Sequence, residues 1–153
     1  MRNKIFKIVA LLLIQCSVLY GQNSISQNHN YILTRSPLAG VSDISNLNST
    51  HCLHTIQYLD QTGKLEETVL LKRSPNSCDI IDYQEYDALD RATSEWLPIV
   101  YESNNNGAFV DSGTQLELSR EFYNDFDPLS ATHYEPSFRE RISAKFGAGE
   151  DWN

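Results

Sequence analysis

The sequence predicts a mainly β domain built of tandem β-hairpins, with one or two short helices. The first observation is a short repeat, found at residues 58–64 (YLDQTGK) and 86–91 (YDALDR). In each copy an aspartate follows a tyrosine, and a turn residue then precedes a basic residue. A repeat of this kind is usually one supersecondary unit that packs against its neighbours. The second observation is that strand-like segments flank both copies, and the third is that residues 65–72 alternate with a period of two.

Each copy of the repeat has the composition of a hairpin turn. Asp60 and Asp87 stand at the start of the two turns, where an aspartate caps a turn by accepting backbone N–H groups. Gly63 can supply a positive φ, and Arg91 is expected to begin the return strand. The strands are expected at residues 52–58, 65–72, 80–86 and 92–97, after a first strand at residues 31–35.

Two short helices are predicted in the C-terminal part of the chain. Residues 114–117 (TQLE) fit a capping box that opens a helix reaching Tyr123. Residues 137–140 (SFRE) fit the same pattern, and apolar residues spaced by four predict a second helix over residues 138–146. Before the first helix, the polar run 102–107 is expected to form a long exposed loop.

The first 21 residues have the order of an export signal. Basic residues precede the apolar run 8–14 and a more polar stretch, with cleavage expected between Gly21 and Gln22. We therefore expect a mature protein in the periplasm, at the cell surface or outside the cell. Residues 22–30 are polar and aperiodic, which predicts a disordered mature N-terminus. The alternative is an uncleaved anchor, but the apolar run is shorter than the roughly 20 residues that span a bilayer.

The charge of the chain argues against nucleic-acid binding. Its formal net charge is −8, and loss of the signal would remove basic residues but no acidic ones. Nucleic acids and anionic membrane surfaces need clustered positive charge, so neither is an expected partner. We also expect no stable membrane insertion after signal cleavage.

Cys52 and Cys78 are the two cysteines that would remain after signal cleavage. In an exported protein such a pair is a candidate disulfide, and the alternative is two buried free thiols. Together with His51 and His54 they could supply zinc ligands, but their spacing is not that of a common structural zinc site. We therefore expect no metal and no other cofactor.

Residues 56–64 and 85–98 resemble the N-terminal domain of unknown function that precedes YD/RHS repeats in large secreted proteins of Bacteroidota. The resemblance continues in one order through residues 30–37 (NYILTRSP), 106–109 (NGAF), 122–125 (FYND), 134–137 (YEPS) and 146–149 (FGAG) with Trp152. It implies that residues 31–153 form hairpins of the YD-repeat type. It also implies a non-catalytic structural module at the N-terminus of a secreted repeat shell, with the downstream YD/RHS repeats as its partner.

The chain departs from this family pattern in two ways. Asp90 stands where the family usually has glycine, although glycine takes a left-handed conformation more easily. The family also continues into a long array of YD hairpins, whereas this sequence stops at Asn153. We therefore expect a truncated copy of the opening module.

Two other functions fit single features of the sequence. Residues 109–114 (FVDSGT) have the form of an aspartic-protease motif centred on Asp111, but that chemistry needs a second aspartate with which to share a proton. The many aromatic residues in the strands could form a glycan-binding surface, although such residues more often fill a core.

Residues 124–127 (NDFD) offer oxygen ligands for calcium but lack the rest of an EF-hand loop. The sequence therefore favours a structural module with no catalytic residues, and not an enzyme.

Overall fold

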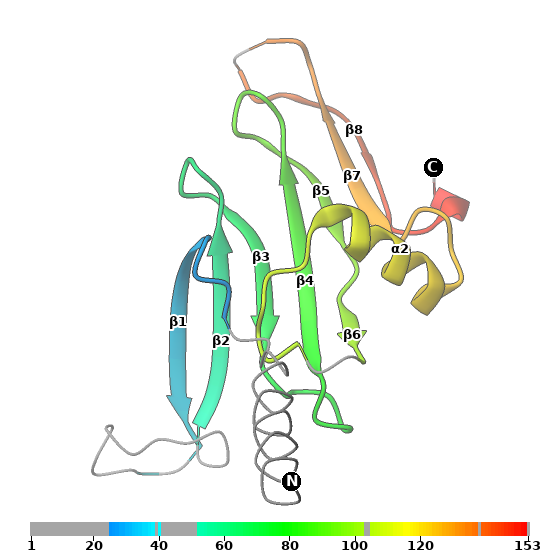
Figure 1. Cartoon of the computed structure of the whole chain (residues 1–153). Coiled ribbons are helices and arrows are strands. Elements are labelled where there is room, and N and C mark those ends of the chain that lie inside the picture. Colours follow the sequence, from blue (N-terminus) through cyan, green and yellow to red (C-terminus); the bar gives the residue numbers. More distant parts are fainter. Residues whose placement is uncertain (1–24, 39, 41–51, 103–104, 138, 153) are drawn as a thin grey trace, which may run out of the picture.

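The computed structural model describes residues 25–38, 40, 52–102, 105–137 and 139–152. They form one eight-stranded antiparallel sheet with a helix on one of its faces (Figure 1). The strands are β1 (Asn30–Pro37), β2 (Cys52–Leu59), β3 (Leu65–Leu70), β4 (Asp79–Tyr86), β5 (Ala92–Trp96), β6 (Ile99–Tyr101), β7 (Leu129–Tyr134) and β8 (Ile142–Phe146). The helix is α2 (Ser112–Tyr123), and a short 3-10 helix, η2 (Glu150–Trp152), follows β8. The prediction of a mainly β fold is confirmed.

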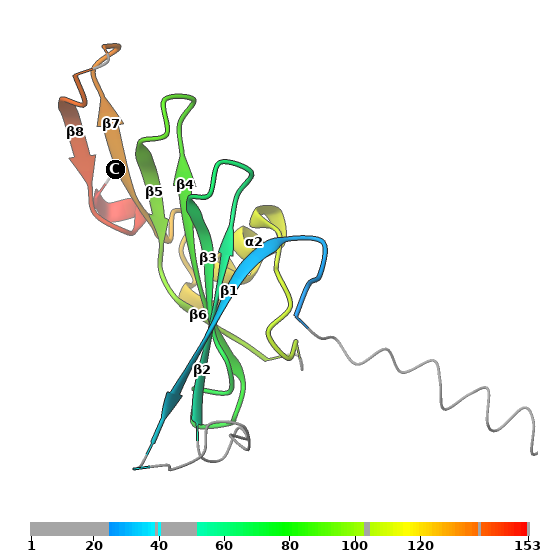
Figure 2. The same ribbon diagram turned by 90° about the vertical axis from the view of Figure 1, so that its left-hand side faces the viewer.

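Neighbouring strands in the sheet follow the order β1-β2-β3-β4-β5-β7-β8. Strand β4 has two partners on one side, because its first residues pair with β6 and its last residues pair with β5. The chain leaves the sheet after β6 to form α2 and returns as β7 beside β5. The sheet twists strongly across its width (Figure 2), as right-handed strand twist requires.

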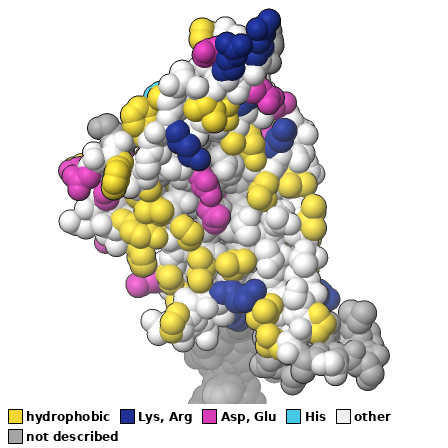
Figure 3. All heavy atoms as spheres, turned by 180° about the vertical axis from the view of Figure 1, so that it is seen from behind, with side chains coloured by type: hydrophobic (Ala, Val, Ile, Leu, Met, Phe, Trp, Pro, Cys, Tyr) yellow, Lys and Arg dark blue, Asp and Glu magenta, His cyan; other side chains and the backbone are white. Residues whose placement is uncertain are grey.

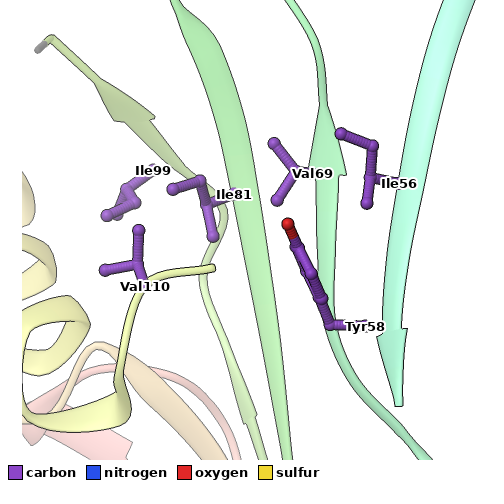
Figure 4. Packing of buried hydrophobic residues seen from close by; sticks show 6 residues of the cluster. All are labelled: Ile56, Tyr58, Val69, Ile81, Ile99 and Val110. Atoms are coloured by element: carbon purple, nitrogen blue, oxygen red, sulfur yellow. The ribbon is translucent and has the colours of Figure 1, made fainter. Parts of the chain in front are cut away.

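The core lies on the face of the sheet that α2 covers. Ile56, Val69 and Ile81 are register partners on β2, β3 and β4, and all three side chains are fully buried. Ile99 of β6 and Val110, which precedes α2, complete this cluster together with Tyr58 (Figure 4). The alternation of buried and half-buried residues along these strands is the period of two expected for a sheet with one covered face.

The segment before α2 crosses the core instead of forming the exposed loop predicted for residues 102–107. That prediction is wrong for Asn105 and Gly107, which are both buried, while residues 103–104 lie outside the described part of the chain. Gly107 has φ +81°, and a Cβ at this position would meet Ile56 Cδ1 at 2.3 Å. The Tyr58 hydroxyl donates to the Gly107 carbonyl oxygen at 2.6 Å, and Asp79 Oδ2 accepts the Gly107 N–H at 2.8 Å. Glycine is therefore required by both the backbone conformation and the close approach.

The first predicted helix is confirmed as α2, which ends at Tyr123 as expected. It begins earlier than predicted, because the capping residue is Asp111 and not Thr114. The Asp111 side chain accepts the Thr114 N–H at 3.1 Å and the Thr114 hydroxyl at 2.7 Å. At the other end, Asn124 takes a left-handed conformation and its N–H donates to the Arg120 carbonyl oxygen.

The second predicted helix, over residues 138–146, is wrong. Residues 142–146 form β8, which pairs with β7, and Phe138 lies outside the described residues. The apolar residues at positions 142 and 146 suit both a helical spacing of four and a strand period of two. Pairing with β7 decides between them, since tertiary contacts override a short local pattern.

The N-terminal segment that was predicted to be disordered packs on the core where the structure describes it. Ile25 lies against the core cluster. The Ser26 N–H donates to the Tyr58 hydroxyl at 3.0 Å, and the Ser26 hydroxyl accepts the Phe109 N–H at 3.1 Å. His29 stacks on the Phe109 ring at 4.1 Å. The disorder prediction is thus corrected for residues 25–30, while residues 22–24 and the proposed signal lie outside the described part.

Candidate functional site

The turns 60–64 and 87–91 close their hairpins with the same backbone bonds. In each turn the N–H of the first residue donates to the carbonyl oxygen of the fifth at 2.9 Å. The N–H of the fourth residue donates back to the carbonyl oxygen of the first, at 3.2 Å in one turn and 2.9 Å in the other. Both turns lie at the same end of the sheet (Figure 1). The sequence repeat therefore corresponds to a repeated turn geometry.

The aspartate side chains repeat the same pattern. Oδ1 of Asp60 accepts the N–H groups two and four residues later at 2.7 and 2.9 Å, and Oδ1 of Asp87 accepts the equivalent pair at 2.9 and 3.0 Å. The N–H of Lys64 lowers the pKa of Asp60, and the Arg91 guanidinium lowers that of Asp87. Because these bonds favour the ionised carboxylate, both aspartates hold their turns as anions.

The fourth residue of each turn has a left-handed backbone. Gly63 has φ +85° and Asp90 has φ +60°. Aspartate tolerates this region better than most residues but less readily than glycine. Asp90, where the resemblance predicted glycine, therefore lies at a position with positive φ.

A third turn of the same kind, residues 74–78, was missed by the sequence analysis. The Ser74 and Cys78 backbones bond at 3.1 Å, and Ser77 donates back to the Ser74 carbonyl oxygen at 2.9 Å with φ +57°. The Ser74 hydroxyl accepts the Cys78 N–H at 2.8 Å, as the aspartate does in the other turns. A serine in place of the aspartate, midway between the two copies, is the signal that could have revealed it. The three turns join four consecutive strands, β2 to β5.

Arg91 connects its turn to the β7–β8 hairpin. Its guanidinium donates to Asp87 Oδ2 at 2.8 and 2.6 Å. It also donates to the carbonyl oxygens of Glu135 and Ser137 at 3.3 and 3.1 Å, and it lies over the Tyr134 ring at 4.5 Å. Arginine suits this role because its planar fork can bond several acceptors while it stacks on an aromatic ring. This second set of contacts had no signal in the sequence.

No disulfide joins Cys52 and Cys78, which are both free thiols. Cys52 begins β2, and Cys78 immediately precedes β4. Strand β3 lies between β2 and β4, and strands two apart in a sheet are about 10 Å apart. A disulfide needs Cα atoms within about 7 Å, so the candidate bridge is corrected to two separate thiols.

Asp111, the centre of the aspartic-protease alternative, serves as the N-terminal cap of α2. Both of its oxygens bond Thr114, whose hydroxyl and N–H lower the Asp111 pKa. Within the described residues no hydrogen bond joins Asp111 to another carboxyl group. The protease chemistry needs a second carboxyl group that shares a proton with Asp111, whereas here both Asp111 oxygens are engaged by Thr114 at the start of α2.

Glu67 is a fully buried carboxyl group in the core face of the sheet. Its register partners on both sides are tyrosines, Tyr58 and Tyr83. One carboxylate oxygen accepts the Val110 N–H at 3.0 Å, which ties the centre of the sheet to the segment before α2. Burial raises the pKa of Glu67 to about 8, and the nearby charge of Asp111 adds to this. Nothing in the sequence predicted that this acid is buried.

The aromatic residues and the candidate metal ligands lie in different places. Tyr58, Tyr83 and Trp96 are buried, and the last two meet edge to face at 5.6 Å, so these rings fill the core.

Among the described residues, no group of three or more His, Cys, Asp or Glu side chains could hold a metal ion. Oδ1 of Asp125, in the segment considered for calcium, instead accepts the N–H groups of Asp127 and Glu150. His51 lies outside the described residues.

Residues 33–153 match the family described as a domain of unknown function, DUF6443. The chain belongs to the DUF6443 family. The match begins within β1 and extends through η2, and it includes all three turns and the Asp111 cap. No curated protein and no solved structure matches this DUF6443 chain significantly. In the part of the chain that the structure describes, no helix is both long and apolar enough to cross a bilayer.

Proposed function

We propose that this DUF6443 chain is a non-catalytic structural module of an exported protein, the N-terminal part of a YD/RHS-repeat shell. The observation that carries the proposal is the threefold use of one turn geometry, which closes three successive hairpins of a single sheet. Repeat architectures place copies of one supersecondary unit side by side, with each copy packed against its neighbours. Asp111, the centre of the protease alternative, caps α2, and the buried Glu67 accepts the Val110 N–H.

The last strand offers a place where further hairpins could join. Strand β8 pairs with β7, and no other described strand pairs with its outer edge. Ile142 on this strand is 56% exposed. An open edge strand is a template for another strand, so a following YD hairpin could continue the sheet there.

Co-expression tests this proposal. The full chain is produced with a YD-repeat polypeptide encoded in the same genome, and their association is measured by affinity purification and native mass spectrometry. We expect a stoichiometric complex that Ile142→Lys disrupts, because a charge on the edge blocks strand pairing. The matched control is Ile32→Lys, since Ile32 is 50% exposed on β1 at the opposite edge of the sheet. Absence of a complex with the wild-type chain, or equal loss in both variants, would refute the proposal.

A further inference from the structure

A groove runs between the outer edge of β6 and helix α2. It has a volume of about 500 Å³. Its walls are Val100, Tyr101 and Glu102 on the sheet side, and Leu118, Glu121 and Phe122 on the helix side. Phe122 is 52% exposed and lies beside the other apolar lining residues, so its ring is available to an apolar side chain that enters the groove. The groove therefore combines apolar walls with two carboxyl groups, one from each side.

The edge of β6 is open along this groove. Strand β6 pairs with β4 through Ile99, Val100 and Tyr101. Within the described ranges no strand pairs with its other side. An unpaired strand edge presents N–H and carbonyl groups to which an extended peptide can add by main-chain hydrogen bonds.

A strand added to β6 would present its side chains alternately to two apolar surfaces. On one side lies the row Leu70, Ile80 and Val100, register neighbours on β3, β4 and β6 that face away from the core. On the other side lie Tyr101, which packs toward the core, and Phe122 of α2. Seen from behind, hydrophobic side chains gather left of centre on the open face, with acidic side chains beside them (Figure 3). Such alternating contacts are what gives strand addition its selectivity.

The charges of the groove decide which kind of segment fits. Glu102 and Glu121 are both exposed, and the lining contains no Lys or Arg. Complementary charge steers partners to an interface, whereas like charges exclude them. A second copy of this chain would bring the same two carboxylates to the groove, which disfavours self-association there. Lys or Arg side chains beside apolar ones would be favoured.

We propose that this groove binds an extended segment of a partner protein as an added strand on β6, and that this segment carries both bulky apolar residues and Lys or Arg on each of its two faces. The occupant is a peptide segment because the binding surface is a strand edge, and it is basic because both walls carry a carboxylate. The proposal is independent of the structural role suggested for β8, since it uses a different strand and a different partner chemistry.

Binding of a synthetic peptide tests the proposal. The probe is a short fluorescent peptide in which pairs of valine residues alternate with pairs of lysine residues, so that each face of the extended peptide carries both. It is added to the full chain, and binding is followed by fluorescence anisotropy. We expect saturable binding, about tenfold weaker binding for the valine–glutamate peptide, and loss of binding when alternate backbone amides of the probe are N-methylated. Equal binding of the N-methylated peptide would refute strand addition, and equal binding of the acidic peptide would refute the charge argument.

Two pairs of matched variants locate the binding surface. Glu121→Lys and Phe122→Ala should each weaken binding of the valine–lysine peptide about tenfold or more. Glu150→Lys makes the same charge change at an exposed residue of η2 outside the groove, and Phe126→Ala removes an aromatic ring that is 70% exposed but also outside the groove. Both should change the affinity by less than about twofold. Equal losses in a variant and its control, or no binding by the wild type, would overturn the proposal. Sedimentation that shows a dimer abolished by Phe122→Ala would assign the groove to a second copy and overturn it as well.

Discussion

Asp60 and Asp87 hold their turns in the same way, because Oδ1 of each lies between the N–H groups of the residues two and four positions later. Ser74 makes the second of these bonds in the third turn. Each side chain satisfies backbone donors that the hairpin leaves unpaired. The repeat in the sequence thus marks a local hydrogen-bonding device that recurs at successive hairpins.

The first prediction compares the cap of the turn at Ser74 with that at Asp87. Ser74→Ala should lower the free energy of unfolding by about 1 kcal/mol, since it removes one bond to a backbone N–H. Asp87→Ala should lower the melting temperature by more, because it also removes the carboxylate partner of Arg91, whose side chain is only 10% exposed. Urea and thermal unfolding measure both variants, with Glu117→Ala on the exposed side of α2 as the control. If Asp87→Ala melts with the wild type, the aspartate does not stabilise its turn.

The second prediction concerns the fourth residue of the turn. Gly63→Val should destabilise the protein by about 1–2 kcal/mol, because a β-branched residue is strained at positive φ. The cause would be the backbone alone, since nothing lies within 4 Å of a Cβ placed on Gly63. Asp90→Gly should leave stability unchanged or raise it, because it relieves the same strain. Unfolding curves for both variants provide the test, and a Gly63→Val variant as stable as the wild type would contradict it.

The sequence predicted the hairpins well where a local rule applied. Aspartate at the start of a turn and glycine near its end are signals with a direct physical cause, so Asp60 and Gly63 could be placed before the structure was known. The turn at Ser74 follows the same geometry but was missed, because serine makes the same bond with a less distinctive residue. The sequence motif made Asp111 the centre of a catalytic alternative, but its side chain bonds the N–H and the hydroxyl of Thr114, which is the signature of a helix cap.

Features that depend on strand order could not be predicted from the sequence. The prediction of a disulfide between Cys52 and Cys78 was wrong because β3 lies between their strands. The spacing of the two cysteines in the sequence does not reveal this strand order. The helix predicted over residues 138–146 is wrong because residues 142–146 pair with β7 as strand β8. Glu67 looked like any surface acid in an alternating strand, and its burial follows from Val110, which is distant in sequence and covers it in the fold.

The last prediction concerns the pH dependence that Glu67 gives to stability. In the folded protein the pKa of Glu67 is about 8, against 4.5 for the free side chain, mainly because the carboxyl group is buried. Between these two values the folded state holds a proton that the unfolded state has released. The free energy of unfolding should therefore fall as the pH rises from about 4.5 to about 8, by a total on the order of a few kcal/mol. Below about pH 4.5 the stabilisation of the folded state by protonated Glu67 is fully present. Above about pH 8 this stabilisation is lost.

Glu67→Gln isolates this effect from other titrating groups. The amide oxygen of glutamine can still accept the Val110 N–H, but the side chain cannot ionise. The variant should lose less stability than the wild type as the pH rises, so that the difference between them shifts in favour of Glu67→Gln between pH 4.5 and about 8 and levels off above that. Groups that do not interact with Glu67, including His54 with its lowered pKa, contribute equally to both proteins and cancel in this difference. Urea unfolding at a series of pH values measures it, with Glu117→Gln as the exposed control. A stability difference that is the same at every pH would mean that Glu67 does not change its ionisation on folding.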